Sequence, residues 1–210
     1  MRRSSKLRLR RTILSVVSLA LVVAGVALIA SYFLLPDQES TATNSNNPKG
    51  FNVPKISSTQ ETNVGGPADK TLTVTIPKMT RVENASVPYT YGEDEPALKE
   101  HAAIHLEGTG FPWQAEANVY LAGHRIGYPG YSSFLAFYDL NKLENGDEIL
   151  VTDANDTTYT YRVFKTFVAD PSDLSVTEAV PGKNVVTLQT CTLPDYTERL
   201  IVQGELVNRA

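Results

Sequence analysis

Three residues whose side chains are suited to acyl transfer stand at the ends of apolar, strand-like segments. Cys191, the only cysteine of the 210-residue chain, ends the segment 185–191, His124 follows a similar apolar run, and Arg199 begins another. A thiolate can attack an acyl group, an imidazole can move protons, and a guanidinium can stabilise an oxyanion. These residue types therefore predict a nucleophilic acyl-transfer site, provided that the strands bring them together.

Each of the three side chains would have a defined part in such chemistry. An unperturbed cysteine thiol has a pKa of about 8.5, so Cys191 needs help to attack an amide near neutral pH. A neighbouring His124 imidazolium would stabilise the thiolate and later protonate the departing amine. Arg199 would stay protonated and offer fixed donors to the oxyanion. Taken singly, the cysteine could instead be a buried, inert side chain and the arginine an ordinary surface residue.

The segments that carry these residues resemble those of the sortases, the cysteine transpeptidases of Gram-positive cell surfaces. The resemblance lies in Thr-Leu-Gln-Thr-Cys at 187–191, Leu-Ala-Gly-His-Arg at 121–125 and Arg-Leu-Ile-Val at 199–202. It covers about residues 71–207 and implies the catalytic set His124, Cys191 and Arg199. It also implies an eight-stranded β-barrel whose active site is a groove floored by strands and walled by loops. The motifs look most like class E, with class D second.

The resemblance implies a membrane-anchored enzyme that acts on surface proteins bearing a C-terminal sorting signal. The signal would be of the Leu-Pro-x-Thr-Gly or Leu-Ala-x-Thr-Gly kind, cleaved after threonine through a thioester on Cys191. The acyl group would then pass to an amine of a peptidoglycan precursor or to a pilin-type lysine.

Two alternative functions remain open at this point. One is a cell-wall cysteine peptidase or L,D-transpeptidase, but papain-like enzymes place cysteine before histidine, and L,D-transpeptidases carry His-Gly-Cys. Here His124 precedes Cys191, and Leu-Gln-Thr stands before the cysteine. The other alternative is a non-catalytic extracytoplasmic β-barrel binding module, whose cysteine would react slowly with a thiol probe.

Residues next to the proposed catalytic set are candidates for substrate binding. Thr190 precedes the nucleophile, and Tyr128 follows the histidine by four positions. Either side chain could contact substrate, and either could serve in ordinary strand or rim packing.

No cofactor is expected. His101 and His105 are four positions apart on a predicted helix, but no further cluster supports a metal site. The acidic residues Asp170, Asp173 and Glu178 could help to bind calcium, although a hard-cation site requires a geometry that the pattern does not provide.

The first 35 residues predict a membrane anchor. Residues 1–11 hold six cations and no acid, and residues 13–35 contain no charge. A helix of that length spans roughly 34 Å, enough for a hydrocarbon core of about 30 Å. A cleaved signal peptide is the alternative, but its apolar region is usually only about 7–15 residues long. We therefore expect a basic cytoplasmic tail at 1–11, a single transmembrane helix at 12–35 and an extracellular catalytic domain.

Charge and cysteine content restrict the partners. With the six tail cations set aside, the formal charge falls from −4 to −10, so nucleic acid is an unexpected partner. A single cysteine cannot form an internal disulfide, and thiols are usually avoided outside the cell.

The remaining chain predicts a linker followed by an all-β domain. Residues 36–70 are rich in Asn, Ser, Thr, Pro and Gly and are expected to form a flexible linker. Residues 71–210 alternate short period-two segments with turn residues, a pattern typical of a β-barrel of about eight strands. We expect strands at 71–76, 81–87, 118–122, 148–152, 157–168, 185–190 and 199–207, a helix at 95–106, and helical turns within 131–143 and after Asp173.

Overall fold

The computed structural model describes residues 65–210, which include all three candidate catalytic residues. The predicted basic tail (1–11), the predicted membrane anchor (12–35) and all but the last six residues of the predicted linker (36–70) lie outside the described residues. Within 65–210, no helix is long and apolar enough to cross a membrane.

Residues 65–210 form nine strands, one α-helix and two short 3-10 helices. The strands are β1 (Leu72–Thr75), β2 (Ala85–Val87), β3 (Tyr89–Thr90), β4 (Ile104–Leu106), β5 (Ala117–Ala122), β6 (Glu148–Thr152), β7 (Thr158–Ala169), β8 (Asn184–Cys191) and β9 (Arg199–Arg209). The helical segments are α2 (Glu95–Glu100), η1 (Leu140–Lys142) and η2 (Leu174–Thr177). Each of the seven expected strands overlaps an observed one, which confirms the prediction of an all-β domain.

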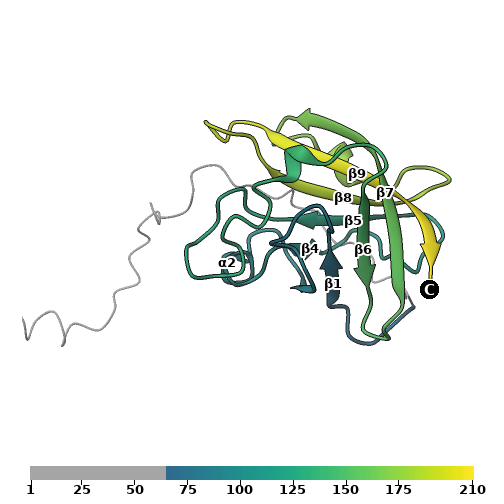
Figure 1. Ribbon diagram of the computed structural model, residues 1–210. Coiled ribbons are helices and arrows are strands. Elements are labelled where there is room, and N and C mark those ends of the chain that lie inside the picture. Colours follow the sequence, from purple (N-terminus) through teal and green to yellow (C-terminus); the bar gives the residue numbers. More distant parts are fainter. Residues whose placement is uncertain (1–64) are drawn as a thin grey trace, which may run out of the picture. The chain divides into compact units, whose positions relative to one another are not determined.

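The nine strands belong to one sheet in the order β2-β1-β6-β7-β9-β8-β5-β4-β3. The sheet curls into a nearly closed barrel, in which the long strands β7 and β9 are antiparallel neighbours (Figure 1). Most neighbouring strands are antiparallel, whereas β5 and β8 are parallel and so are β3 and β4. In the sequence, β6 and β7 lie between β5 and β8, whereas in the sheet β5 and β8 are neighbours. The chain therefore forms β6 and β7 on the other side of the barrel before it returns to lie beside β5.

The segment 95–106, which was expected to be one helix, differs from the prediction. Only α2 is helical, and the carboxylate of Asp94 caps it by accepting a hydrogen bond from the Ala97 amide (3.1 Å). The backbone is already extended at His101, and β4 then pairs with the end of β5. This pairing also creates the short ninth strand β3, so the barrel has nine described strands rather than the expected eight. A partner distant in sequence therefore overrode the local helical pattern.

Alternate residues of six strands fill the barrel interior. The hydroxyl groups of two buried tyrosines there are satisfied, since Tyr159 donates to Asp153 (3.0 Å) and Tyr161 donates to Asn184 (2.8 Å). This well-packed interior fixes the strands whose ends carry the candidate catalytic residues. Its apolar members include Leu72, Val74, Val119, Leu121, Ile149, Val151, Val186, Leu188, Leu200 and Val202.

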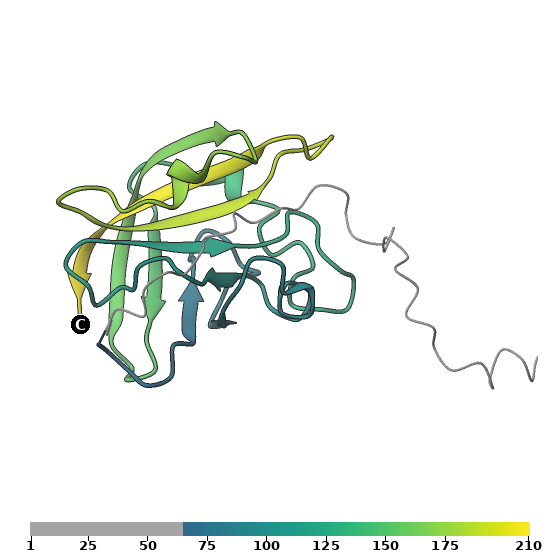
Figure 2. The ribbon, with the colours of Figure 1, turned by 180° about the vertical axis from the view of Figure 1, so that it is seen from behind.

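The outer face of β5, β8 and β9 carries a second apolar cluster, and Cys191 belongs to it. Tyr120 and Ile201 lie on this face because side chains alternate along each strand. Leu98 of α2 and Val176 of η2 cover the cluster from outside the sheet. Figure 2 shows from behind how β5 and β8 run side by side beneath β9.

The last residues of the predicted linker, 65–70, pack against the barrel. Pro67 is buried, and Lys70 Nζ donates to two carbonyls of the same segment (2.7 and 2.8 Å) while it lies over the ring of Trp113 (5.0 Å). Gly66 has a left-handed φ of +72°, and a Cβ there would lie 2.2 Å from the Trp113 indole. Only glycine therefore fits at this contact.

Candidate active site

The parallel pair β5 and β8 brings His124 and Cys191 to the same end of the sheet. The register matches Ala122 with Gln189, and the Gly123 amide donates to the Gln189 carbonyl (3.0 Å) just beyond this pair. Two residues further along, the same register places His124 level with Cys191. His124 thus lies just after the carboxyl end of β5 and Cys191 is the last residue of β8, as the sequence pattern requires for a common site.

Arg199 reaches this place from β9. In the antiparallel pair of β8 and β9, Cys191 and Arg199 stand directly opposite each other. Residues in such positions point to the same face of the sheet, with Cβ atoms about 4.5–5.5 Å apart. His124, Cys191 and Arg199 are each only 2% exposed. The three residues singled out from the sequence are therefore brought together in a place largely shielded from water.

The local environment disfavours the Cys191 thiolate. Burial raises the pKa of the Cys191 thiol, and the positive charges of Arg199 and Arg125 oppose this rise without cancelling it. Near neutral pH the thiolate is consequently a minority species. Chemistry at this sulfur depends on a group that stabilises the thiolate or accepts the proton of the thiol.

The Arg199 guanidinium is fixed by the backbone that leads into β9. Its Nη1 donates to the carbonyls of Glu198 (3.1 Å) and Tyr196 (3.3 Å). The acidic β7–β8 loop lies near it: the pKa of Asp170 is lowered, mainly by hydrogen bonds from Ser172 and also by the charge of Arg199. A guanidinium held in this way is preorganised to face a developing negative charge.

A buried tyrosine–glutamine pair lies on the same face as Cys191. The hydroxyl of Tyr120 donates to Oε1 of Gln189, two positions before the cysteine. Burial raises the pKa of Tyr120, while the charge of Arg199 lowers it and that of Asp173 raises it. Tyr120 therefore stays protonated and keeps Gln189 in one orientation beside the thiol.

His124 belongs to the segment that follows β5, and its side chain lies between Glu95 of α2 and Tyr128 of its own segment. Its Nε2 is 3.7 Å from Oε1 of Glu95, an ion-pair distance longer than a hydrogen bond. The same carboxylate oxygen accepts a hydrogen bond from the Tyr128 hydroxyl (2.6 Å). The rings of His124 and Tyr128 meet edge to face, with centroids 5.5 Å apart. The imidazole is thus bounded by a carboxylate and an aromatic ring.

The two predicted substrate-binding residues have different surroundings. Thr190 alternates with Cys191 and pairs with Leu200, so its buried side chain faces the barrel interior. Tyr128 is half-buried beside the imidazole, and the Lys99 ammonium lies 5.6 Å from its ring centroid. Their roles in substrate binding stay predictions, which the position of Tyr128 favours more than that of Thr190.

The histidines considered for metal binding lie on different elements. His101 is the C-cap of α2, and its Nδ1 is 3.2 Å from the Ser86 carbonyl. His105 lies in β4, fully buried, with Nε2 2.9 Å from the Gly110 carbonyl. Among residues 65–210, no three His, Cys, Asp or Glu side chains are grouped so that they could hold a metal ion.

The acidic residues considered for calcium are partly engaged in their own loop. Asp170 accepts hydrogen bonds from the amide and hydroxyl of Ser172, and Asp173 caps η2 by accepting from the amide of Ser175 (3.0 Å). This cap confirms the helical turn expected after Asp173.

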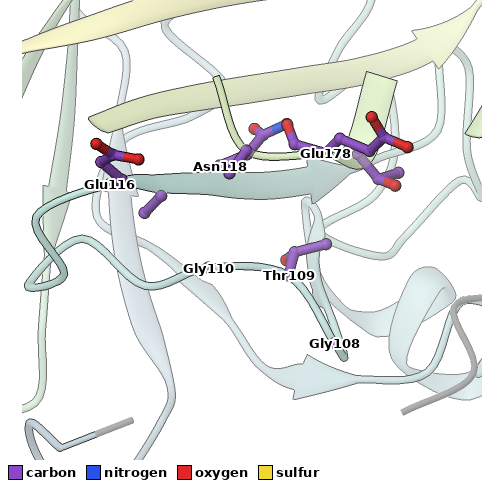
Figure 3. A pocket seen from close by; sticks show the side chains of 9 residues that line it. Gly108, Thr109, Gly110, Glu116, Asn118 and Glu178 are labelled. Carbon is purple, nitrogen blue, oxygen red and sulfur yellow. The ribbon is translucent and has the colours of Figure 1, made fainter. Parts of the chain in front are cut away.

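A pocket of about 270 Å³ lies between the β4–β5 segment and the β7–β8 loop. Figure 3 shows Asn118 on β5 beside this pocket, with Gly108 and Gly110 on the facing segment. Asn118 Nδ2 donates to the carbonyls of Val176 and Glu178, both at 2.9 Å. The loop is thereby tethered to the strand that leads to His124.

A second pocket, of about 570 Å³, lies next to the candidate catalytic residues. Arg125, Thr192 and Leu193 line it, and they lie one or two positions along the chain from His124 or Cys191. The guanidinium of Arg125 donates to Asn141 Oδ1 (2.7 Å) and lies 5.9 Å from the Tyr138 ring centroid. Cys191 itself does not line this pocket.

Two charged neighbours of the site, Arg125 and Glu95, were not predicted from the sequence. Arg125 follows the histidine directly, so its place in the same motif could have indicated a role near the thiol. Glu95 precedes His124 by 29 positions, and no local pattern links the two residues.

Fold and site together define a β-barrel with a thiol, an imidazole and a guanidinium at one end of three adjacent strands. The family model of the sortase domain matches residues 74–207. The chain belongs to the sortase family.

Individual relatives agree with this assignment. Sortase A of Streptococcus agalactiae is 30% identical over 144 residues, which cover 68% of this chain and 52% of that protein. Sortase SrtE1 of Streptomyces coelicolor is 36% identical over 111 residues, covering 47% and 29% of the two chains. The chain thus spans about half of the first curated relative and less of the second.

Solved structures of C-type sortases have a similar fold. Sortase C2 of Group B Streptococcus pilus island 1 has a TM-score of 0.56 and 32% identity, covering 68% of this chain and 77% of that one. Sortase C-1 of Actinomyces oris has a TM-score of 0.53 and 33% identity, covering 65% and 73%.

Proposed function

We propose that this protein is a cysteine transpeptidase that cleaves a peptide sorting signal and transfers the acyl fragment to an amine. One observation carries the proposal: the register of β5, β8 and β9 brings His124, Cys191 and Arg199 to one buried end of the sheet. Membership of the sortase family supports the same assignment.

The reaction would proceed in two acyl transfers. In the first, the Cys191 thiolate attacks the scissile carbonyl carbon, and Arg199 faces the oxyanion. His124 gives its proton to the departing amine as the C–N bond breaks, which leaves a thioester. In the second, an amine attacks the thioester carbonyl, His124 accepts a proton from the amine, and the thiolate leaves.

Membership of the sortase family supports a proposal for the substrate class. The proposed signal is of the LPXTG or LAXTG kind, cleaved after threonine, near the C-terminus of a surface protein. The proposed acceptor is an amine of a cell-wall precursor or a pilin-type lysine, and the structural similarity to pilus-related sortases of Group B Streptococcus supports the lysine. A single-pass anchor at 12–35, with the catalytic domain outside the cell, would place the enzyme beside these substrates.

The full chain in detergent micelles, incubated with pentapeptide signals and a primary amine, tests the proposal. Mass spectrometry should detect cleavage after threonine and an amide product that contains the added amine. Cys191→Ala should abolish both products while leaving the fold intact, because a small buried side chain is replaced by one of similar size. Cleavage without amine incorporation would favour a peptidase. Absence of cleavage, together with slow alkylation of Cys191, would favour a binding module.

A further inference from the structure

The surroundings of His124 contain a carboxylate that the three-residue catalytic set does not use. Glu95, the first residue of α2, holds Oε1 3.7 Å from the His124 Nε2 and is 38% exposed. The Tyr128 hydroxyl donates to this same oxygen at 2.6 Å, which restrains the carboxylate beside the imidazole. The Tyr128 hydroxyl thus keeps the Glu95 carboxylate beside the buried imidazole of His124.

The charged and titratable groups around the imidazole come from three elements. From α2 come Glu95 and the Lys99 ammonium, from the segment after β5 comes Tyr128, and from β8 comes Cys191. Burial alone would raise the pKa of Glu95, but the neighbouring His124, the Tyr128 hydroxyl and the Lys99 charge together lower it. The carboxylate is therefore ionised near neutral pH and available to a positive imidazolium.

We propose that Glu95 is a positioning residue that holds His124 and favours its imidazolium form, thereby increasing the population of the thiolate–imidazolium pair. The consequence for turnover rests on the proposed transpeptidase function, whereas the effect on the thiol does not. An opposite charge a few ångströms away favours the charged form of an ionisable group.

The two halves of the ion pair are stabilised by different residues. Arg199 and Arg125 act on the thiolate, whose formation burial opposes. Glu95 acts on the imidazolium. Because a proton must move from sulfur to nitrogen to create the reactive pair, stabilising either half increases its population.

Alkylation of Cys191 by iodoacetamide tests this inference without any substrate. The full chain in detergent micelles is compared with Glu95→Gln over a range of pH, since the rate follows the thiolate. We expect Glu95→Gln to react about fivefold more slowly near neutral pH, the effect of losing one partly solvated ion pair. At pH values well above the raised pKa of the Cys191 thiol, where it ionises unaided, the two rates should converge.

Two further variants separate charge from packing. Glu100→Gln removes a carboxylate from the exposed end of the same helix and should behave as the wild type. Tyr128→Phe retains the ring and leaves the charge of Glu95 in place but removes the hydroxyl that restrains the carboxylate, so alkylation near neutral pH should be slowed less than by Glu95→Gln. Equal rates for wild type and Glu95→Gln near neutral pH would overturn the inference. So would a slowing that is the same at every pH and is shared by Tyr128→Phe, because it would indicate disturbed packing.

The outcomes also distinguish this inference from the proposed function. If no signal peptide is cleaved but the pH-dependent alkylation difference is observed, the transpeptidase proposal fails and the positioning role stands. If peptides are cleaved and Glu95→Gln alkylates like the wild type, the positioning role fails alone.

Discussion

At the scale of single residues, Arg199 combines a fixed geometry with a charge that acts on the thiol. Its guanidinium donates to two backbone carbonyls and stands opposite Cys191 in the sheet. Arg199→Lys keeps the positive charge but replaces a rigid planar set of donors by one flexible ammonium. Turnover of a signal peptide should therefore fall by about 10²–10³, the typical effect of removing one oxyanion donor.

The same variant should leave the reactivity of Cys191 nearly unchanged, because the positive charge that favours the thiolate is retained. Peptide turnover and alkylation measured side by side separate these two effects. Arg162→Lys, an exposed arginine that pairs with Glu148, is the matched control and should alter neither. Near-normal turnover by Arg199→Lys, or a thiol as unreactive as in His124→Ala, would remove Arg199 from the oxyanion role.

The types of the three candidate catalytic residues could be predicted from the sequence more readily than their contacts. A lone cysteine, a histidine and an arginine at strand ends can be recognised because strand periodicity is local. The contact between Glu95 and His124 depends instead on where α2 lies against β5, and no local pattern encodes that placement. The effect of burial on the thiol pKa likewise arises only when α2 and η2 cover the outer face of the sheet.

At the scale of elements, the side chain of Asn118 ties the β7–β8 loop to β5. Its Nδ2 donates to two loop carbonyls, and Asn118 itself is only 1% exposed. Asn118→Ala removes both hydrogen bonds and should lower the free energy of unfolding by about 1–3 kcal/mol. Urea denaturation measures this loss, and faster hydrogen exchange at 170–183 should accompany it. Asn208→Ala, an exposed position near the end of β9, serves as control. Unchanged exchange in the loop would show that other contacts hold it.

Elements with a regular period were predicted well, and those defined by a distant partner were not. The alternation in 148–152 and 157–168 corresponds closely to β6 and β7, which form a local hairpin. The apolar residues of 104–106 are compatible with a helical face as well as with a strand. They form a strand because they pair with β5, which is distant in the sequence pattern. Residues 65–70 were assigned to a linker on composition alone. Their packing on Trp113 depends on a left-handed glycine and on the cation–π contact of Lys70.

At the scale of the whole molecule, the barrel holds the active site in place, and the stability of the barrel depends on pH through a buried histidine. His105 of β4 is fully buried between aromatic rings, with centroids 4.9 Å from both Tyr89 and Phe111. Its burial lowers the pKa of the imidazole to about 3, although the Gly110 carbonyl opposes this shift. The native barrel therefore keeps His105 neutral at pH values where an unfolded chain would protonate it.

The sign of the effect on stability follows from this depressed pKa. The contribution of His105 is fully present above about pH 6.5 and is lost as the pH falls toward about 3, at up to roughly 1.4 kcal/mol per pH unit. Between pH 7 and pH 5 the wild type should lose about 2 kcal/mol more unfolding free energy than His105→Gln, which cannot titrate but can still donate to the Gly110 carbonyl. Urea denaturation at the two pH values provides the comparison, and His101→Gln, at a half-buried histidine outside the core, should follow the wild type. If the unfolding free energies of wild type and His105→Gln decline in parallel, acid loss of stability has another source.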